Sequence, residues 1–139
     1  MKPTHRPIVV VFVVFGAVMA VVGVSRWMAP KEIVPWRSDL SAARTEAQTS
    51  GRPVLAYFTA DWCGPCHSMK STTWADAGVE EALRRYVPVR IDVDLNSAAA
   101  MEYNAQVIPK FAVLDAAGNV VKSAEGYMDP QQFLAWLNG

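Results

Sequence analysis

The residues best suited to chemistry are Cys63 and Cys66, the two cysteines of the chain, which occur in the run 60–67, Ala-Asp-Trp-Cys-Gly-Pro-Cys-His. An apolar, strand-like segment comes directly before this run, so we expect the pair at a strand-to-helix junction. The first cysteine would then occupy a helix N-terminus, where free N–H groups and the helix dipole favour a thiolate over a thiol. Cys63 is therefore the expected nucleophile. Cys66, one turn later, is placed to resolve a mixed disulfide formed by Cys63.

The two residues between the cysteines suit the start of a helix. Gly64 allows a tight turn, and Pro65 has the fixed φ and the missing N–H that a first helical turn tolerates.

Three other interpretations use the same residues. Residues 63–67 fit the C-x-x-C-H pattern of covalent haem attachment, but a strand and a tryptophan precede them, and His5 lies beyond an apolar segment. A structural zinc site normally takes four Cys or His ligands, and only His67 and the distant His5 could join the cysteines. A plain structural disulfide is the third interpretation. It is disfavoured because a disulfide that closes so short a loop removes little conformational entropy from the unfolded chain and so stabilises the fold little. Redox chemistry is favoured, without a metal or another cofactor.

The chain has 139 residues, which is enough for one domain and a short appendage. Lysine and arginine total 13, as do aspartate and glutamate, so no attraction to nucleic acid is expected. The appendage is N-terminal. A short basic tail at 1–7 precedes an uncharged, valine-rich run from Ile8 to Val24, which as a helix would be about 25 Å long. We expect an uncleaved membrane anchor at 8–25, with a cleaved signal as the alternative.

The charges around this segment predict its orientation. A short basic tail before a first span usually stays inside the cell, although Arg26, Lys31 and Arg37 follow the span. We expect a single-pass protein of the inner membrane whose domain faces the periplasm or the cell exterior. Residues 26–35 contain two prolines and mixed charges, which predicts a semi-extended linker. The domain is then expected at 36–139.

Local patterns within 36–139 predict alternating helices and strands. Ser38 or Asp39 can cap a first helix that Gly51 ends, and Asp129 with Gln132 forms a capping box for the last helix. The expected elements, in order, are a helix between this cap and Gly51, a strand at 53–60, the dithiol helix, a helix after Asp76, a strand at 87–93, a helix at 98–103, a strand at 110–114, a hairpin turn at 116–119, a strand at 120–123 and a helix after Asp129. This alternation predicts parallel pairing and a small α/β sandwich.

The order of elements, together with Trp62-Cys63-Gly64-Pro65-Cys66, resembles the thioredoxin superfamily over 36–139. A second landmark is Ile108-Pro109, directly before the strand at 110–114, where members of the superfamily carry a cis-proline packed against the dithiol. The resemblance implies a central mixed sheet flanked by helices. It also implies a groove in which extended substrates pair with the backbone of Ile108. The implied groove residues are Trp62, Gly64, Pro65, Ile108, Pro109 and Gly126.

Residues 58–63 and 90–94 look most like the C-terminal domain of Dsb-type transmembrane thiol reductases. This resemblance implies a protein thiol:disulfide oxidoreductase that acts on protein thiols and disulfides and is recharged by a membrane electron donor, with apocytochrome c maturation as one version. The Gly-Pro spacer resembles that of reducing thioredoxins, so reduction of disulfides outside the cytoplasm is expected. A disulfide oxidant or isomerase and a non-catalytic binding module are the alternatives.

Two residues depart from the thioredoxin pattern. Tyr57 occupies the position, six residues before the first cysteine, where thioredoxins have a buried acid that helps to deprotonate the resolving thiol. Asp61 or His67 could replace that acid through water, although a surface carboxylate and an exposed histidine are the plainer interpretations. Lys110 replaces the usual threonine after the proline, and we expect it to tune the choice of partner.

Overall fold

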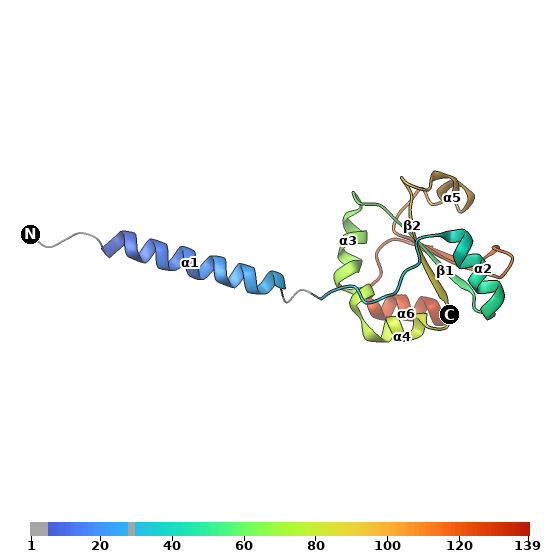
Figure 1. Ribbon diagram of the computed structural model, residues 1–139, viewed down its shortest axis with the longest axis horizontal. Helices are drawn as coiled ribbons and strands as arrows, with labels where there is room; N and C mark the ends of the chain where they lie inside the picture. Colours follow the sequence, from blue (N-terminus) through green and yellow to red (C-terminus); the bar gives the residue numbers. More distant parts are fainter. Residues whose placement is uncertain (1–5, 28–29) are drawn as a thin grey trace, which may run out of the picture. The chain divides into compact units, whose positions relative to one another are not determined.

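The computed structural model describes the backbone of residues 6–27 and 30–139, and the side chains of 10–21 and 30–139. The chain divides after Pro30 into two compact units, and each is described by itself. The first unit contains one helix, α1 (Arg6–Trp27), whose described side chains are all exposed (Figure 1). Most of the basic tail expected at 1–7 lies outside the described residues. In the part of the chain that is described, no helix is both long enough and apolar enough to cross a membrane.

The second unit, Lys31–Gly139, is a four-stranded sheet with helices on both of its faces (Figure 1). Its elements are α2 (Leu40–Ser50), β1 (Val54–Thr59), α3 (Gly64–Ser71), the 3-10 helix η1 (Thr73–Ala75), α4 (Ala77–Leu83), β2 (Val87–Asp92), α5 (Ser97–Glu102), β3 (Lys110–Leu114), β4 (Val120–Glu125) and α6 (Pro130–Asn138). The strands lie in the order β2-β1-β3-β4. The mixed α/β sheet expected from the sequence is confirmed.

Strand direction differs in part from the prediction of parallel pairing. β1 and β2 are parallel, from Val54 opposite Val87 to Thr59 opposite Asp92, but β3 runs antiparallel to both β1 and β4. The reason is the shortness of the helix before β3. The six residues of α5 cover only about 9 Å, less than half the length of a six-residue strand, so they do not carry the chain back along the sheet. β3 therefore starts at the same end of the sheet as the end of β2.

The predicted helix caps are present. The Asp39 side chain accepts a hydrogen bond from Ala42 N at 2.7 Å at the start of α2, and Gly51 ends that helix with a left-handed φ of 71°. At the start of α6, the capping box of Asp129 and Gln132 forms in both directions. Because each cap satisfies backbone groups that the helix leaves unpaired, these residues fix where the helices begin and end.

The core lies on both faces of β1, since alternate side chains of a strand point to opposite faces. Val54, Ala56 and Phe58 pack against α2 and α5. Leu55 and Tyr57 belong to the second cluster, which contains the aromatic side chains of η1, β3 and α6. β1 is thus buried throughout, as its apolar sequence predicts, and it carries the chain to the dithiol within a rigid sheet.

Residues 31–37, called the strap below, belong to the folded unit. The Ile33 N–H donates to the Trp74 carbonyl at 2.8 Å, and Val34 is only 6% exposed within the core. Arg37 then pairs with the free edge of β2 through two backbone hydrogen bonds of 2.9 Å. The folded unit therefore starts at Lys31 rather than at Trp36, because burial of an apolar side chain and pairing with a strand edge hold this segment in place.

Candidate active site

The two cysteines lie at the N-terminus of α3, where the sequence predicts them. Cys63 is the N-cap, and its Sγ accepts a hydrogen bond from Cys66 N at 3.3 Å. Gly64 and Pro65 form the first turn. Cys63 and Cys66 are joined by a disulfide, with 5.2 Å between their Cα atoms, and are 3% and 1% exposed. Chain direction and helix start thus bring both sulfurs to the end of the helix that favours negative charge.

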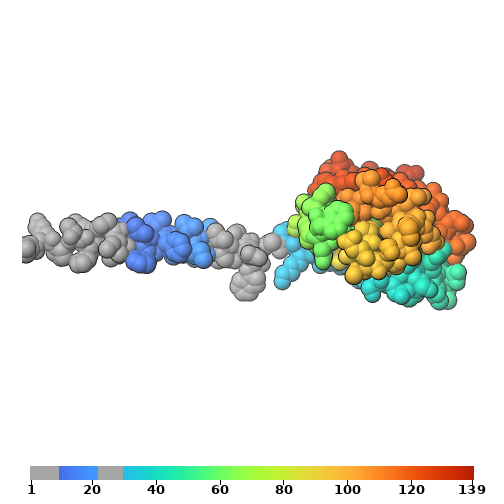
Figure 2. All heavy atoms as spheres, turned by 90° about the horizontal axis from the view of Figure 1, so that it is seen from above, coloured from blue at the N-terminus to red at the C-terminus, as the bar shows by residue number. Residues whose placement is uncertain are grey.

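A second segment completes the site. Ile108 packs against the buried cluster of Ala60, Cys63 and Cys66, and the Ile108–Pro109 peptide bond is cis. In Figure 2 the green spheres of α3 lie next to the amber spheres of the segment between β2 and β3. Within the described part of the chain, neither the N–H nor the C=O of Ile108 makes a hydrogen bond. Backbone groups able to pair with a further strand therefore lie beside the disulfide.

Gly126 lies beside this segment. Its N–H donates to the Pro109 carbonyl at 2.7 Å, and its φ of 92° is in the left-handed region that favours glycine. The structure thus places Gly126 next to Pro109, as the resemblance implies.

Trp62 is anchored by Asp94, a residue that the sequence analysis did not identify. The indole is 68% exposed, and its Nε1 donates to Oδ2 of Asp94 at 2.8 Å. Asp94 lies in the loop just beyond β2. In this loop the backbone N–H groups of residues 94 and 95 donate hydrogen bonds to the Asp92 carboxylate. Only the position of β2 beside β1 brings residues 62 and 94 together, so no local sequence signal predicts this contact.

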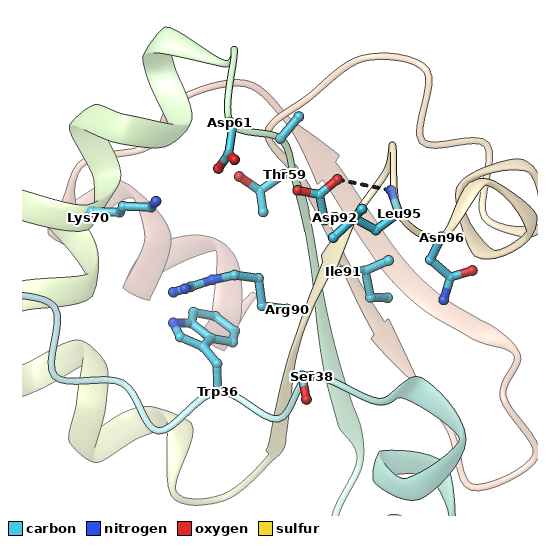
Figure 3. Close-up of a pocket in the computed structure, with 11 residues that line it drawn as sticks. Trp36, Ser38, Thr59, Asp61, Lys70, Arg90, Ile91, Asp92, Leu95 and Asn96 are labelled. Carbon is cyan, nitrogen blue, oxygen red and sulfur yellow. Dashed lines mark hydrogen bonds between the residues drawn. The ribbon is translucent and has the colours of Figure 1, made fainter.

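Asp61 and His67, the expected aids to proton transfer, are both exposed. His67 Nε2 lies 2.6 Å from the backbone oxygen of Asp61. Because a carbonyl oxygen only accepts, the imidazole nitrogen is the donor, and the ring ties the first turn of α3 to the loop before it. The Asp61 carboxylate makes no hydrogen bond or ion pair with the described residues and points into a cavity (Figure 3).

This cavity has a volume of about 500 Å³ and lies between β1, β2, α3 and the strap. Thr59 and Asp61 line the cavity, and Lys70 and Arg90 reach it from α3 and β2 (Figure 3). Ala60, between Thr59 and Asp61, also lines it. The cavity is not predictable from the sequence, because its walls come from four separate segments.

A family described as thioredoxin-like matches residues 35–116 of this sequence. The chain belongs to the thioredoxin-like family. Over 97 residues it is 36% identical to the thiol:disulfide interchange protein DsbD of Yersinia enterocolitica and 32% identical to that of Yersinia pestis. These alignments cover 66% of this chain and 17% and 16% of the relatives, so the chain spans about a sixth of their length.

Solved structures agree with this assignment. A thioredoxin from Thermus thermophilus matches 76% of this chain, and 85% of its own, with a TM-score of 0.68 and 28% identity. The C-terminal domain of Neisseria meningitidis DsbD, in the oxidised form, matches 74% of this chain, and 97% of its own, with a TM-score of 0.62 and 25% identity. The fold of the second unit is therefore that of thioredoxin.

Tyr57 is fully buried at the place where the thioredoxin pattern has an acid. Its ring stacks on Phe111, with 5.6 Å between centroids, and packs against Trp36 and Trp74. Burial raises the pKa of the Tyr57 hydroxyl, so the phenol is neutral near neutral pH. The hydroxyl makes no hydrogen bond of normal geometry among the described residues, and the nearby side chains of Thr59 and Trp74 oppose the rise in its pKa only in part. A neutral phenol is no substitute for a carboxylate base.

Lys110 is buried beside the cis-proline of this thioredoxin-like unit. Its Nζ donates to Oε1 of Glu125 at 2.9 Å and to the Asn104 carbonyl at 3.2 Å. Lys110 thus ties the segment that carries Ile108 to β4. Its partner Glu125 was not identified from the sequence, because the two residues meet only through the antiparallel register of β3 and β4.

The described side chains contain no group of three or more His, Cys, Asp or Glu residues placed to hold a metal ion.

Proposed function

We propose that this chain is a protein thiol:disulfide oxidoreductase in which Cys63 is the nucleophile and Cys66 is the resolving thiol. The observation that supports this most strongly is the Cys63–Cys66 disulfide at the N-terminus of α3, beside the unpaired backbone of Ile108. The curated relatives are named thiol:disulfide interchange proteins. The pair can gain and lose two electrons without any other cofactor.

The reaction has two steps. The Cys63 thiolate attacks one sulfur of a substrate disulfide, a mixed disulfide forms, and the other substrate sulfur leaves as a thiolate that takes up a proton. Cys66 then loses its proton and attacks Sγ of Cys63. The Cys63–Cys66 bond forms, the bond to the substrate breaks, and the second substrate sulfur leaves. Two electrons pass from the dithiol to the substrate.

The local structure supports these roles. The helix N-terminus and the Cys66 N–H, 3.3 Å from Sγ of Cys63, both stabilise negative charge on that sulfur. Cys66 lies one turn deeper and is less exposed, so it reaches Cys63 more readily than it reaches a protein substrate.

The substrate groove is proposed to lie along the segment before β3. The N–H and C=O of Ile108 would pair with an extended substrate segment, as in other cases of strand addition. Pro109 and Gly126 would line one side of this segment, and Trp62 with the Gly64–Pro65 turn the other. The hydrogen bond between Gly126 N and the Pro109 carbonyl supports this arrangement, because it holds the two residues of one side together.

The direction and the location are part of the proposal. We propose that the chain reduces protein disulfides outside the cytoplasm, that residues 8–25 anchor it in the inner membrane, and that a membrane electron donor recharges it. The uncharged run from Ile8 to Val24 and the DsbD relatives support these points. Apocytochrome c is one class of substrate that fits. In cells, a protein tag after Gly139 should be digested by protease added outside the inner membrane.

Trapping of mixed disulfides tests the proposed reaction. The Cys66→Ser variant, expressed as the full chain, should accumulate disulfide-linked adducts through Cys63 that a reductant removes. The Cys63→Ser variant is the matched control and should accumulate far fewer, because Cys66 is the more buried thiol. Absence of adducts in Cys66→Ser would instead indicate a binding module with a structural disulfide.

A further inference from the structure

The resolving step, which rests on the function proposed above, requires a group that accepts the proton of Cys66. Tyr57 occupies the expected place of that group, but it is a neutral phenol with a raised pKa. A side chain that accepts this proton must therefore lie elsewhere. The cavity beside the dithiol is the part of the structure that can do so.

The cavity reaches the dithiol through one residue. Ala60 lines the cavity and also belongs to the buried cluster of Cys63 and Cys66. Next to it, the side chain of Thr59 points into the cavity although the residue is only 6% exposed (Figure 3). Its hydroxyl lies near that of Tyr57 but makes no hydrogen bond of normal geometry with the described residues. A polar cavity of about 500 Å³ is large enough for several water molecules. Water in the cavity can therefore carry a proton away from the dithiol, along the wall that contains Thr59.

Four charged side chains line the cavity, and two of them have partners among the described residues. On β2, the Arg90 guanidinium pairs with Glu32 of the strap, and the Asp92 carboxylate accepts the N–H groups of residues 94 and 95. On α3, the Lys70 ammonium lines the cavity without an ion pair among the described residues. Asp61 is the lining carboxylate without a hydrogen bond there, and it is the residue that follows Ala60.

We propose that this cavity is the proton path of the resolving step and that the Asp61 carboxylate accepts the Cys66 proton through cavity water. The Cys66 thiol gives its proton to the water chain, the chain gives one to Asp61, and the thiolate attacks Sγ of Cys63. The departing substrate thiolate then takes the proton back from Asp61 through solvent, so the charges balance. Lys70, one turn after Cys66, places a positive charge on the same cavity and favours the thiolate.

His67 is the rival acceptor. Its Nε2 already donates to the backbone of Asp61, and the ring does not line the cavity. The proposal therefore assigns it no part in the proton transfer. This difference makes the two residues separable by substitution.

A two-phase reaction tests the path on the full reduced chain. With 5,5′-dithiobis(2-nitrobenzoate), attack by Cys63 releases one coloured thiolate, and resolution by Cys66 releases the second. Stopped-flow absorbance as a function of pH follows both phases in wild type, Asp61→Asn, Asp61→Glu, Thr59→Val, His67→Gln and Glu81→Gln. Glu81 is an exposed acid of α4 and controls for the loss of one negative charge.

In Asp61→Asn, the second phase should be at least about tenfold slower near pH 6 to 7, since a positioned base contributes roughly 10²- to 10⁴-fold. The first phase should change by less than about threefold. The second phase should recover above about pH 9, where hydroxide can take the proton. Asp61→Glu should restore most of the rate at neutral pH, which a purely structural role would not explain. Thr59→Val should slow only the second phase, and Glu81→Gln should match wild type. His67→Gln, which loses the imidazole hydrogen bond to the Asp61 backbone, should slow the second phase much less than Asp61→Asn does.

An Asp61→Asn second phase equal to that of wild type at every pH would overturn the proposal, as would equal slowing by His67→Gln. The circular dichroism spectrum of each variant separates these results from misfolding, and Asp61→Glu tests the path if Asp61→Asn is unfolded. Absence of the first phase in wild type would instead refute the proposed function, because that phase depends on Cys63 alone.

Discussion

The indole nitrogen of Trp62 donates a hydrogen bond to the Asp94 carboxylate at 2.8 Å, across 32 positions of the sequence. An exposed aromatic side chain beside the dithiol is thereby held against the loop that follows β2. A fixed side chain loses less conformational entropy when it meets a partner than a free one does. The contact therefore holds Trp62 in one position on the proposed protein-binding surface before a partner binds.

Removal of the Asp94 carboxylate should weaken binding of proteins but leave the chemistry intact. In Asp94→Ala, we expect KM for a protein disulfide to rise by roughly three- to tenfold, in line with the loss of one hydrogen bond of about 0.5–1.5 kcal/mol. The reagent 5,5′-dithiobis(2-nitrobenzoate) is too small to depend on the Trp62 indole for binding. The rate of the first phase with this reagent should therefore stay near that of wild type. Asp94→Asn keeps an oxygen acceptor and should fall between the two. A KM for Asp94→Ala equal to that of wild type would show that the anchor has no role in binding.

The Lys110–Glu125 pair should respond unequally to loss of its two members. Lys110 is buried, whereas Glu125 is exposed. Glu125→Gln leaves a buried ammonium with a weaker partner and should lower the free energy of unfolding by about 1–3 kcal/mol. Lys110→Met removes the buried charge, keeps a similar volume and should cost less. Urea unfolding of the full chain in detergent compares them, and a larger loss in Lys110→Met would contradict this account.

The strap should contribute to the stability of the domain. Val34→Ala removes two methyl groups from the core and should lower the free energy of unfolding by about 1–3 kcal/mol. Ile33→Ala is the matched control. Ile33 is 48% exposed, so its truncation should cost about 0.5 kcal/mol or less. Equal and small effects of both substitutions in urea unfolding would mean that the folded unit does not need the strap.

The elements of the fold were predictable where the signal was local. Gly51 and the Asp129–Gln132 capping box specify helix ends through their own side chains or backbone. The antiparallel direction of β3 was not predictable from alternation, because it depends on how far the short α5 carries the chain. Residues 31–35 of the strap were predicted to be linker, because Pro35 and the charges around it give no sign that Val34 is buried.

Tyr57 provides a prediction about pH. Burial raises the pKa of this phenol, so the folded chain keeps the proton after the unfolded chain, with a pKa of about 10, has released it. The stability that this provides is complete below about pH 10 and is lost as the pH rises further, by up to about 1.4 kcal/mol per pH unit. Tyr57→Phe should therefore lose less stability than wild type above about pH 10.

Near neutral pH, Tyr57→Phe should be as stable as wild type or slightly more so, because the hydroxyl has no partner among the described residues. Tyr103→Phe is the matched control. The Tyr103 hydroxyl donates to the Gly118 carbonyl at 3.2 Å, so its loss should cost about 0.5–1.5 kcal/mol. Urea unfolding at about pH 7 and about pH 11 compares the three proteins. A large loss in Tyr57→Phe at neutral pH would show that its hydroxyl is bonded.

The candidate site was predictable to the extent that it lies in one stretch of sequence. Cys63, Cys66 and the turn between them were found from their spacing, and Pro109 from the resemblance. The contacts with Asp94 and Glu125 and the cavity beside Thr59 depend on strands that meet only in the folded chain. Side-chain chemistry was therefore visible in the sequence, whereas the surroundings that tune it were not.

The most direct test of the central claim is the reduction potential of the Cys63–Cys66 pair. The full chain is equilibrated with dithiothreitol or glutathione redox buffers, and free thiols are trapped and counted. A reductase of the thioredoxin type predicts a reversible two-electron transition near about −270 mV. A value near about −120 mV would contradict the proposed direction. A pair that stays oxidised below about −300 mV would contradict redox function and indicate a structural disulfide.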